Sequence, residues 1–392
     1  MISKSGLNIL LIADVGAESQ HSSVEGLFRS RSQLGITCYK VFFDKRARKP
    51  EPLEDRVILP YKYRRHGLVR VLTEVCPLFE YDAVIVRNLY HALGQLLRAG
   101  LSLKIGFWES FPHSRRRLDE ALFEKKSVWR KQVEYAWSHH SERSLIKKCD
   151  FYLPITEIHK FIYYPDIQTP YMPTPMGFDF ESYPIAPPPK RQGPIRFVYI
   201  GAIDGLRQLD IVNRAFMAQQ SDFVLDYYSF QENAEVEKIK QIQDPRIRFN
   251  GGLSRDKLFA SIKYADAGIC FFPYTKTHIT ASPTKTIEYG ALGLSVLVNP
   301  MPEYKTLLDE QCAFICEFEE DAIAEKVNEI LSADRTVLED KGRLLQQRIL
   351  KQRSYEDMAV PLFSFIRKQC ETESVCVNAY EQPIYNAMAQ QG

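Results

Sequence analysis

Ser282 to Asn299 reads SPTKTIEYGALGLSVLVN, and this stretch says the most about the fold. Ser282 is a typical N-cap residue, and Pro283 suits the first position of a helix. The pattern predicts a helix over Thr284 to Leu292, ended by a glycine, and then a buried strand at Ser295 to Val298. In a doubly wound sheet such a helix begins at the carboxyl edge, where ligands bind and free backbone N–H groups favour a phosphate.

Two charged side chains in this helix indicate a ligand. Lys285 lies in the first turn, where the helix dipole disfavours a cation, so an anionic ligand would explain its presence. Glu288 follows three residues later on the same face and could form an ion pair with Lys285. Its carboxylate could instead accept hydrogen bonds from the two hydroxyl groups of a ribose. The sequence leaves both interpretations of Glu288 open.

Outside this stretch, short apolar runs alternate with helical patterns, which predicts parallel, doubly wound sheets. Helices are expected at Ser22 to Leu34, His91 to Ala99 and Leu209 to Met217. Strands are expected at Leu7 to Ala13, Cys38 to Phe43, Asp82 to Val86, Leu103 to Trp108, Phe151 to Ile155, Ile195 to Ile200, Phe223 to Tyr228, Arg246 to Asn250, Ala267 to Phe272 and Cys312 to Cys316. The second half repeats the order of the first, so two similar α/β units are predicted.

The length and the prolines predict the division of the chain. A chain of 392 residues exceeds the usual limit of about 250 to 300 residues for one hydrophobic core. We expect one domain over residues 1–182, a proline-rich linker over 183–194, a second domain over 195–352 and a terminal helix and tail over 353–392 that packs back on the first domain. Pro361 lies inside the amphipathic pattern of Ser354 to Cys370 and is expected to kink or divide that helix.

Composition excludes several classes of protein. Hydrophobic residues make up 45% of the chain and charged residues 26%, which excludes global disorder. No apolar run reaches the length of about 18 residues that a membrane span requires. The eight cysteines form no C-x-x-C pair, so buried thiols in a reducing compartment are favoured over a zinc or redox site. No secretory signal is evident, and a cytoplasmic protein is expected.

The charge is divided unevenly between the two halves. Residues 1–190 hold 28 Lys and Arg against 21 Asp and Glu, and residues 191–392 hold 23 against 28. A basic first half suits anionic lipid headgroups or a phosphorylated substrate, although a solvated surface explains it equally well. No nucleic-acid motif accompanies these charges, so nucleic acid is not expected as a partner. Arg115 to Trp137 is basic and amphipathic, and burial of its apolar stripe on the domain core is favoured over membrane contact.

Four segments in order resemble the glycosyltransferases of the GT-B fold, especially glycosyltransferase family 4. The motif S-P-x-K-x-x-E-Y with the following A-x-G is similar to that family's donor site. The other three segments are MGFD at Met176 to Asp179, FVYIGAIDGLRQL at Phe197 to Leu209, and ADAGICFFP at Ala265 to Pro273. This resemblance implies two Rossmann-like doubly wound domains that face one another across a cleft. It also implies that the first domain binds an acceptor and the second a nucleotide sugar.

The resemblance implies a role for each matching residue. Glu288 would bind the ribose hydroxyls, and Lys285 would bind the diphosphate together with Arg207, which belongs to the glycine loop that begins at Gly201. Cations and a helix N-terminus around a departing diphosphate stabilise its growing charge without a metal ion. No D-x-D motif of metal-dependent glycosyltransferases occurs, so no metal and no cofactor are expected beyond the nucleotide-diphosphate sugar, which is the donor substrate.

The chain also departs from the family pattern. Many members carry a glutamate where this chain has Thr280, so His278 or the backbone from Thr280 to Ser282 is expected to contact the donor sugar in its place. An exposed histidine in a loop is the more common alternative for His278. A histidine often follows the fourth strand of the first domain, where this chain reads GFWESFPH. Glu109 is the first choice for an acid-base or acceptor-orienting group there, and His113 is the second. A hydrogen-bonded structural glutamate is the alternative for Glu109.

These observations predict a hexosyltransferase-type enzyme that is independent of metal and retains the anomeric configuration, as family 4 enzymes do. Its acceptor would be a glycan or a lipid-linked sugar in the synthesis of a surface polysaccharide or glycolipid. Its place would be the cytoplasm, with peripheral contact to an anionic membrane at the inner face. Two alternatives stay open: a catalytically silent GT-B protein that binds a nucleotide or glycan, and a non-hydrolysing nucleotide-sugar epimerase.

Overall fold

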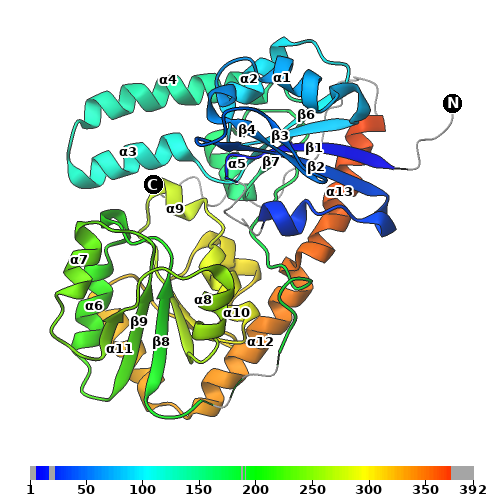
Figure 1. Ribbon diagram of the computed structural model, residues 1–392. Coiled ribbons are helices and arrows are strands. Elements are labelled where there is room, and N and C mark those ends of the chain that lie inside the picture. Colours follow the sequence, from blue (N-terminus) through cyan, green and yellow to red (C-terminus); the bar gives the residue numbers. More distant parts are fainter. Residues whose placement is uncertain (1–5, 17–22, 187–188, 190, 372–392) are drawn as a thin grey trace.

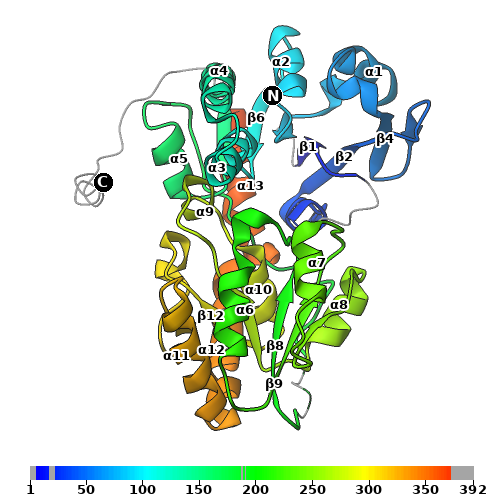
Figure 2. The same cartoon turned by 90° about the vertical axis from the view of Figure 1, so that its left-hand side faces the viewer.

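The computed structural model describes residues 6–16, 23–186, 189 and 191–371. Two α/β units lie one above the other in both cartoon views (Figures 1 and 2). Each unit is built on its own sheet, and the last strand of the first sheet ends at Pro154 while the first strand of the second begins at Ile195. The chain therefore folds as two Rossmann-like units, as the sequence predicts.

The first sheet has seven strands in the order β3-β4-β2-β1-β5-β6-β7, and β3 alone is antiparallel to its neighbour. Its strands are β1 (Leu7–Ile12), β2 (Ile36–Asp44), β3 (Glu51–Pro52), β4 (Arg56–Pro60), β5 (Ala83–Arg87), β6 (Lys104–Glu109) and β7 (Phe151–Pro154). Its helices are α1 (Leu68–Val75), α2 (Tyr90–Arg98), α3 (His113–Glu124), α4 (Val128–Ile146) and α5 (Glu157–Tyr163).

One predicted helix of the first unit is wrong. In place of a helix over Ser22 to Leu34, the structure has a π-helical turn at Ser23–Leu27 and a 3-10 turn at Ser32–Leu34. Residue 22 lies outside the described residues. Arg31 is extended and forms a bridge with Ile36, so the backbone already leaves the helical conformation there and turns into β2. The spacing of hydrophobic residues, on which the helix was predicted, gives no information about that bridge.

The second sheet has six parallel strands in the order β10-β9-β8-β11-β12-β13. They are β8 (Ile195–Ile200), β9 (Phe223–Tyr228), β10 (Ile247–Phe249), β11 (Ala267–Cys270), β12 (Ser295–Val298) and β13 (Phe314–Ile315). The helices are α6 (Leu209–Met217), α7 (Ala234–Lys240), α8 (Arg255–Ile262), α9 (Lys276–Ile279), α10 (Thr284–Ala291), α11 (Glu320–Ser332) and α12 (Arg335–Arg353). Apolar clusters cover both faces of each sheet, which is why these strands read as continuous apolar runs.

The last described helix, α13 (Tyr355–Glu371), returns to the first unit (orange-red in Figure 1). Its buried face, with Ala359 and Phe363, belongs to the same apolar cluster as the strand β1. Pro361 lies inside this helix and does not divide it. The buried neighbours of the proline hold both halves of the helix against one core, so the expected division does not occur.

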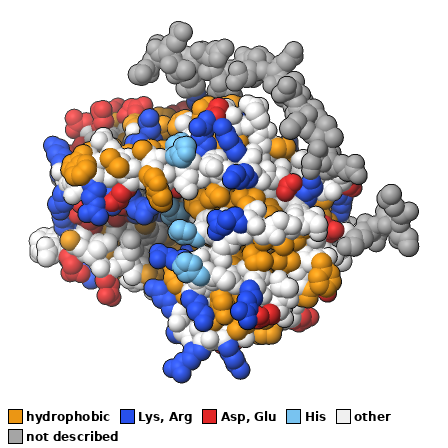
Figure 3. Space-filling view, turned by 90° about the horizontal axis from the view of Figure 1, so that it is seen from above, with side chains coloured by type: hydrophobic (Ala, Val, Ile, Leu, Met, Phe, Trp, Pro, Cys, Tyr) orange, Lys and Arg blue, Asp and Glu red, His pale blue; other side chains and the backbone are white. Residues whose placement is uncertain are grey.

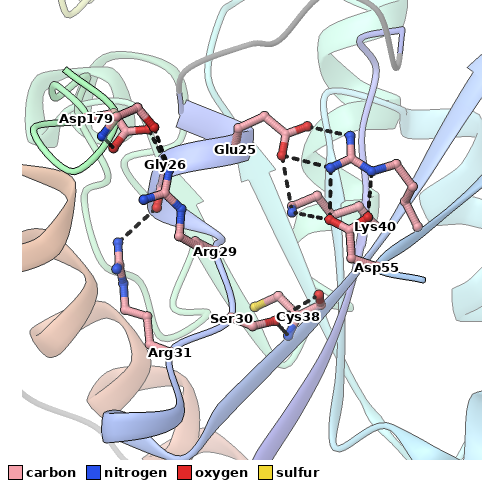
Figure 4. A network of polar contacts seen from close by, with 11 residues as sticks. Glu25, Gly26, Arg29, Ser30, Arg31, Cys38, Lys40, Asp55 and Asp179 are labelled. Atoms are coloured by element: carbon pink, nitrogen blue, oxygen red, sulfur yellow. Dashed lines mark hydrogen bonds and ion pairs between the residues drawn. The ribbon is translucent and has the colours of Figure 1, made fainter. Parts of the chain in front are cut away.

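A polar network holds the segment that leads from the first unit to the second, here called the crossover, against the first unit (Figure 4). Arg29 donates a hydrogen bond to Asp179 at 2.8 Å, and Arg31 donates one to Glu181 at 2.7 Å. Asp179, Glu181 and Glu356 are close enough to one another to hold a metal ion, but these arginines already balance two of the three carboxylates. Among the described helices, none is both long enough and apolar enough to cross a membrane.

Candidate functional site

The carboxyl edge of the second sheet brings Gly201 and Lys285 together. Gly201 follows β8 with a φ of 93°, and a Cβ atom there would lie 3.2 Å from Cε of Lys285. The positive φ therefore favours glycine, and a Cβ atom would also press on the lysine side chain. The ammonium group of Lys285 lies 3.6 Å from the ring centre of Tyr199. The hydroxyl of Tyr289 accepts a hydrogen bond from the Ile200 N–H at 2.9 Å, which joins α10 to the end of β8.

Arg207 stands beside this lysine without a full set of partners. Its side chain is 13% exposed, its guanidinium lies 4.7 Å from the ring centre of Phe272, and its Nε is 4.0 Å from Asp204. Within the described part of the chain, the buried Nε and Nη1 atoms of Arg207 have no hydrogen-bond partner. Burial lowers the pKa of Lys285 well below its usual value, and the charge of Arg207 acts in the same direction. Two neighbouring, largely buried basic side chains favour an anion at this place.

Glu288 has an ion-pair partner that the sequence analysis missed. Arg255 of α8 lies 3.0 Å from its carboxylate, and the Glu288 side chain is 13% exposed. Burial raises the pKa of Glu288, while Arg255 and Lys285 act against that rise. No pattern in the sequence pairs Arg255 with Glu288, because the two residues lie on different helices. The ion pair with Arg255 therefore holds the carboxylate of Glu288 in place.

His278 lies in the same positive surroundings. Its Nδ1 is 3.0 Å from the Thr275 hydroxyl, and its ring packs 5.1 Å from that of Phe272. Burial lowers the pKa of His278 to about 3, and the charges of Arg207 and Arg116 add to the effect. The histidine is therefore neutral at physiological pH. Since Arg116 belongs to α3 of the first unit, the positive field comes from both units.

The side chains of Thr280 and Ser282 are occupied by contacts within the protein. The Thr280 hydroxyl donates to the carbonyl oxygens of Lys276 at 3.0 Å and Thr277 at 3.1 Å. The Ser282 hydroxyl accepts from the Met176 N–H at 3.0 Å and donates to Glu303. Pro283, not Ser282, is the N-cap residue of α10, and no side chain caps this helix. The expected capping role of Ser282 is wrong because its hydroxyl joins the crossover instead.

Helix α3 joins the two units at the edges where their strands end. The carboxylate of Asp119 accepts hydrogen bonds from the N–H and the hydroxyl of Thr277, at 3.0 and 2.6 Å. Arg116 of the same helix donates to Asp204 at 3.0 Å. Since α3 follows β6, whereas Asp204 and Thr277 follow β8 and β11, the carboxyl edges of the two sheets face one another.

Glu109 is enclosed rather than presented to a ligand. The residue is 2% exposed, and its carboxylate accepts hydrogen bonds from Tyr152 at 2.6 Å and Tyr90 at 2.7 Å. His159 lies 3.1 Å from the same carboxylate. Burial acts to raise the pKa of Glu109, but His159 and the tyrosine hydroxyls outweigh it and lower the pKa. These contacts match the structural alternative for Glu109, a hydrogen-bonded glutamate of the core.

His113, by contrast, is exposed at the start of α3. Partial removal from water lowers its pKa, Asp14 and Glu109 oppose this effect, and Arg87 and Arg116 add to it. Asp14 follows β1 and accepts a hydrogen bond from Asn88 at 3.0 Å. The sequence could have pointed to Asp14 and Asn88, because both are polar residues that come just after buried strands.

The expected burial of the apolar stripe in Arg115 to Trp137 is wrong. Lys125 and Ser127 adopt left-handed φ angles of 54° and 48°, so the chain reverses and the segment forms two helices, α3 and α4. Leu118 is buried, but Trp129 and Trp137 of α4 are 74% and 75% exposed. The pattern was interpreted as one helix, and the reversal turns the second part of its stripe away from the core.

No protein-family model matches the chain, and no curated protein matches it. Solved structures do match. Sucrose-phosphate synthase from Thermosynechococcus elongatus is 15% identical, with a TM-score of 0.66 over 92% of this chain and 98% of that one. A trehalose-6-phosphate structure from E. coli, bound with UDP-2-fluoro glucose, is 10% identical, with a TM-score of 0.63 over 93% and 99%. The chain has the GT-B fold.

A third GT-B match is an α,α-trehalose-phosphate synthase (UDP-forming) from Burkholderia xenovorans in complex with glucose-6-phosphate. It is 11% identical, with a TM-score of 0.61 over 93% of this chain and all of that one. Identities of this size show a shared fold, and the fold expected from the donor-site motif is thereby confirmed. What the GT-B fold does in this chain follows from the chemistry of its own residues.

Proposed function

We propose that this protein is a metal-independent glycosyltransferase that takes a sugar from a nucleotide-diphosphate sugar. The observation that carries the proposal is the pair Arg207 and Lys285, two largely buried cations at the carboxyl edge of the second sheet. A diphosphate bound there would accept hydrogen bonds from the unpartnered N–H groups of Arg207. It would also lie near the start of α10. The solved GT-B structure bound with UDP-2-fluoro glucose supports this class of donor.

The cations would also promote the reaction. When the bond between sugar and diphosphate breaks, the leaving group gains negative charge, and preorganised cations stabilise that charge more than they stabilise the ground state. Glu288, held by Arg255, would accept hydrogen bonds from the ribose hydroxyls. Gly201 would let the diphosphate approach the backbone, and the backbone from Thr280 to Ser282 would face the donor sugar beside the neutral His278.

The acceptor would bind on the first unit. His113 is the exposed titratable group at that edge, and we propose it as the group that orients the acceptor hydroxyl. The enclosed Glu109 would be a positioning residue that acts through His159 and the tyrosines. We propose a glycan or lipid-linked sugar as acceptor, with retention of the anomeric configuration and a place at the inner face of the membrane, as the resemblance to family 4 implies.

Thermal unfolding with each nucleoside diphosphate tests the donor site. At a concentration of about one hundred times Kd, the matching nucleotide should stabilise the protein by about 2.7 kcal/mol. Arg207→Ala should abolish this stabilisation, whereas Arg214→Ala, which removes an exposed arginine of α6, should not. Lys285→Ala should lower kcat by about a hundredfold. Absence of stabilisation by every nucleoside diphosphate would contradict the proposal.

A catalytically silent nucleotide-binding protein is the second candidate. Thr280 favours it, because a threonine whose hydroxyl is bonded within its own helix stands where many family members have a glutamate. Release of nucleoside diphosphate from a panel of nucleotide sugars separates the two candidates. Binding without release, for every sugar tested, would favour the silent protein.

A further inference from the structure

Helix α4 presents an apolar stripe that the described residues leave uncovered. Trp129, Val133 and Trp137 follow one another at intervals of four residues, so they lie on one face of the helix. They are 74%, 62% and 75% exposed. Two of the three tryptophans of the protein thus stand in contact with water on one helix face. A contiguous exposed apolar surface of this kind marks an interaction site.

The stripe contributes little to the fold of the first unit. Helix α4 has 19 residues, and its buried residues are Glu142 and Ile146, both near its C-terminal end. Its earlier turns are stabilised by local ion pairs, such as Arg130 with Glu134 at 3.0 Å. The end of α3 adds Leu122 and Phe123, which are 43% and 45% exposed, to the same hairpin. Core packing therefore does not explain these aromatic side chains.

The charge around the stripe identifies the partner. Residues 125–131, where the stripe begins, contain four Lys and Arg and no Asp or Glu, and Lys125 and Lys126 are exposed where the two helices join. Glu124 lies 3.9 Å from Lys126, and Glu134 pairs with Arg130 and Lys131. In the view from above, hydrophobic and basic side chains lie together with some acidic ones over the end of the molecule where α3 and α4 project (left in Figure 3). Tryptophan with lysine and arginine is the composition of surfaces that lie in the headgroup region of anionic bilayers. A second copy of the same basic hairpin would be repelled.

We propose that the α3–α4 hairpin docks on an anionic bilayer. Trp129, Val133 and Trp137 enter the headgroup region, and Lys125 and Lys126 lie against anionic lipids. Arg115 and Arg116 at the start of α3 are not part of this surface, because Arg115 pairs with Asp119 at 2.6 Å and Arg116 pairs with Asp204. The inference extends the proposed function, since docking brings the first unit to a lipid-linked acceptor, but vesicle binding is measured without any sugar transfer.

Cosedimentation of the full-length protein with vesicles tests the surface. The vesicles contain phosphatidylcholine alone or with phosphatidylglycerol, each at low and high salt. The wild type should bind the anionic vesicles, and added salt should weaken the binding. The double variant W129S/W137S should lose at least about tenfold in partitioning. The double variant K125E/K126E should lose about fivefold or more for each lysine removed. The control F79S removes an exposed aromatic of the same unit, 79% exposed, and should bind as the wild type does.

Three results would overturn the inference: no binding of the wild type to anionic vesicles, equal binding of W129S/W137S and wild type, or equal binding to neutral and anionic vesicles. Light scattering adds a fourth, which is self-association of the wild type that W129S/W137S abolishes, because the stripe would then join two copies. Nucleoside-diphosphate stabilisation is measured on the same samples. If no sample is stabilised by a nucleoside diphosphate, the proposed function is contradicted, but the conclusion from vesicle binding is unaffected.

Discussion

Glu109 and Arg207 are both charged and nearly buried, but their surroundings differ. The carboxylate of Glu109 has two tyrosine hydroxyls and His159 within hydrogen-bond distance. The guanidinium of Arg207 has buried N–H groups that no described residue accepts, and Lys285 beside it adds a second positive charge. A buried charge is costly unless it is paired. Glu109 is satisfied by the protein, whereas buried N–H groups of Arg207 are left over for the anionic ligand that we propose.

Glu142 on α4 provides a prediction about pH. It is 7% exposed and accepts a hydrogen bond from the Ser114 hydroxyl at 3.0 Å. Burial, with the negative charge of Glu109, raises the pKa of Glu142 to about 8. The folded state therefore prefers the protonated acid, whereas an unfolded glutamate titrates near about 4.3. The stability that this proton contributes is complete below the unfolded pKa and is lost as the pH rises to about 8.

Glu142→Gln should remove the loss of stability that Glu142 causes as the pH rises. The amide keeps an oxygen that accepts the Ser114 hydrogen bond, and it does not ionise. Its melting temperature should fall less than that of the wild type between about pH 5 and pH 8. Glu124→Gln, an exposed substitution at the end of α3, should follow the wild type. Thermal unfolding across this pH range provides the comparison. If the melting temperatures of wild type and Glu142→Gln fall equally with pH, Glu142 is not the cause of the fall.

At the scale of elements, α3 is one contact between the two units on the side of the candidate site; Thr156 and Tyr163 provide another by donating to the carbonyl oxygens of Thr280 and Lys276. Asp119 is the central residue of the α3 contact, because it joins Arg115 of its own helix to Thr277 of the second unit. Its side chain is 3% exposed, so the ion pair lies in a region of low dielectric. The hairpin that continues into α4 projects beyond this contact and carries the exposed tryptophans (Figure 1). The α3–α4 hairpin therefore carries both the contact with the second unit and the exposed apolar stripe.

Asp119→Ala should lower the free energy of unfolding by about 3 kcal/mol, because it leaves the Arg115 charge and the Thr277 hydroxyl without their partner. Glu120→Ala is the matched control on the same helix, since that carboxylate is 39% exposed. Its cost should stay below about 1 kcal/mol. Urea unfolding measures both variants. Equal costs would mean that the contact between the units adds no stability.

At the scale of the whole molecule, α12 and α13 connect the second unit to the first (Figure 2). The buried side chains of α13 complete the core beside β1, although the helix lies more than three hundred residues further along the chain. The first unit is therefore not built from a continuous segment. Its ring pair Phe28 and Phe363, with centroids 5.9 Å apart, joins the two ends of the chain.

Phe363→Ala should destabilise the protein by about 4 kcal/mol, because it removes a ring that is 2% exposed and leaves a cavity under β1. Val360→Ala, on the exposed side of the same helix, should cost less than about 1 kcal/mol. Denaturant unfolding of both variants, followed by tryptophan fluorescence, measures the difference. A small effect of Phe363→Ala would mean that the first unit folds without α13.

Much of the second unit could be predicted from the sequence. The strands β8, β9 and β12 and the helix α6 begin and end at the predicted residues. Parallel strands with both faces covered are largely continuous apolar runs, and Gly201 marks the end of β8. The first unit was harder, because Arg31 leaves a helical pattern to bridge with Ile36 and because the reversal at Lys125 divides one pattern between two helices.

The sequence by itself determined the two α/β units and the meeting of Gly201, Arg207 and Lys285, because strand ends in a parallel sheet lie at one edge. Only the tertiary structure decided the partners of the charged groups. Arg255 reaches Glu288 from another helix, Asp119 reaches Thr277 from the other unit, and His159 with the tyrosines encloses Glu109. Such contacts depend on burial and on side chains that lie far apart in the chain, and local sequence patterns carry no record of either.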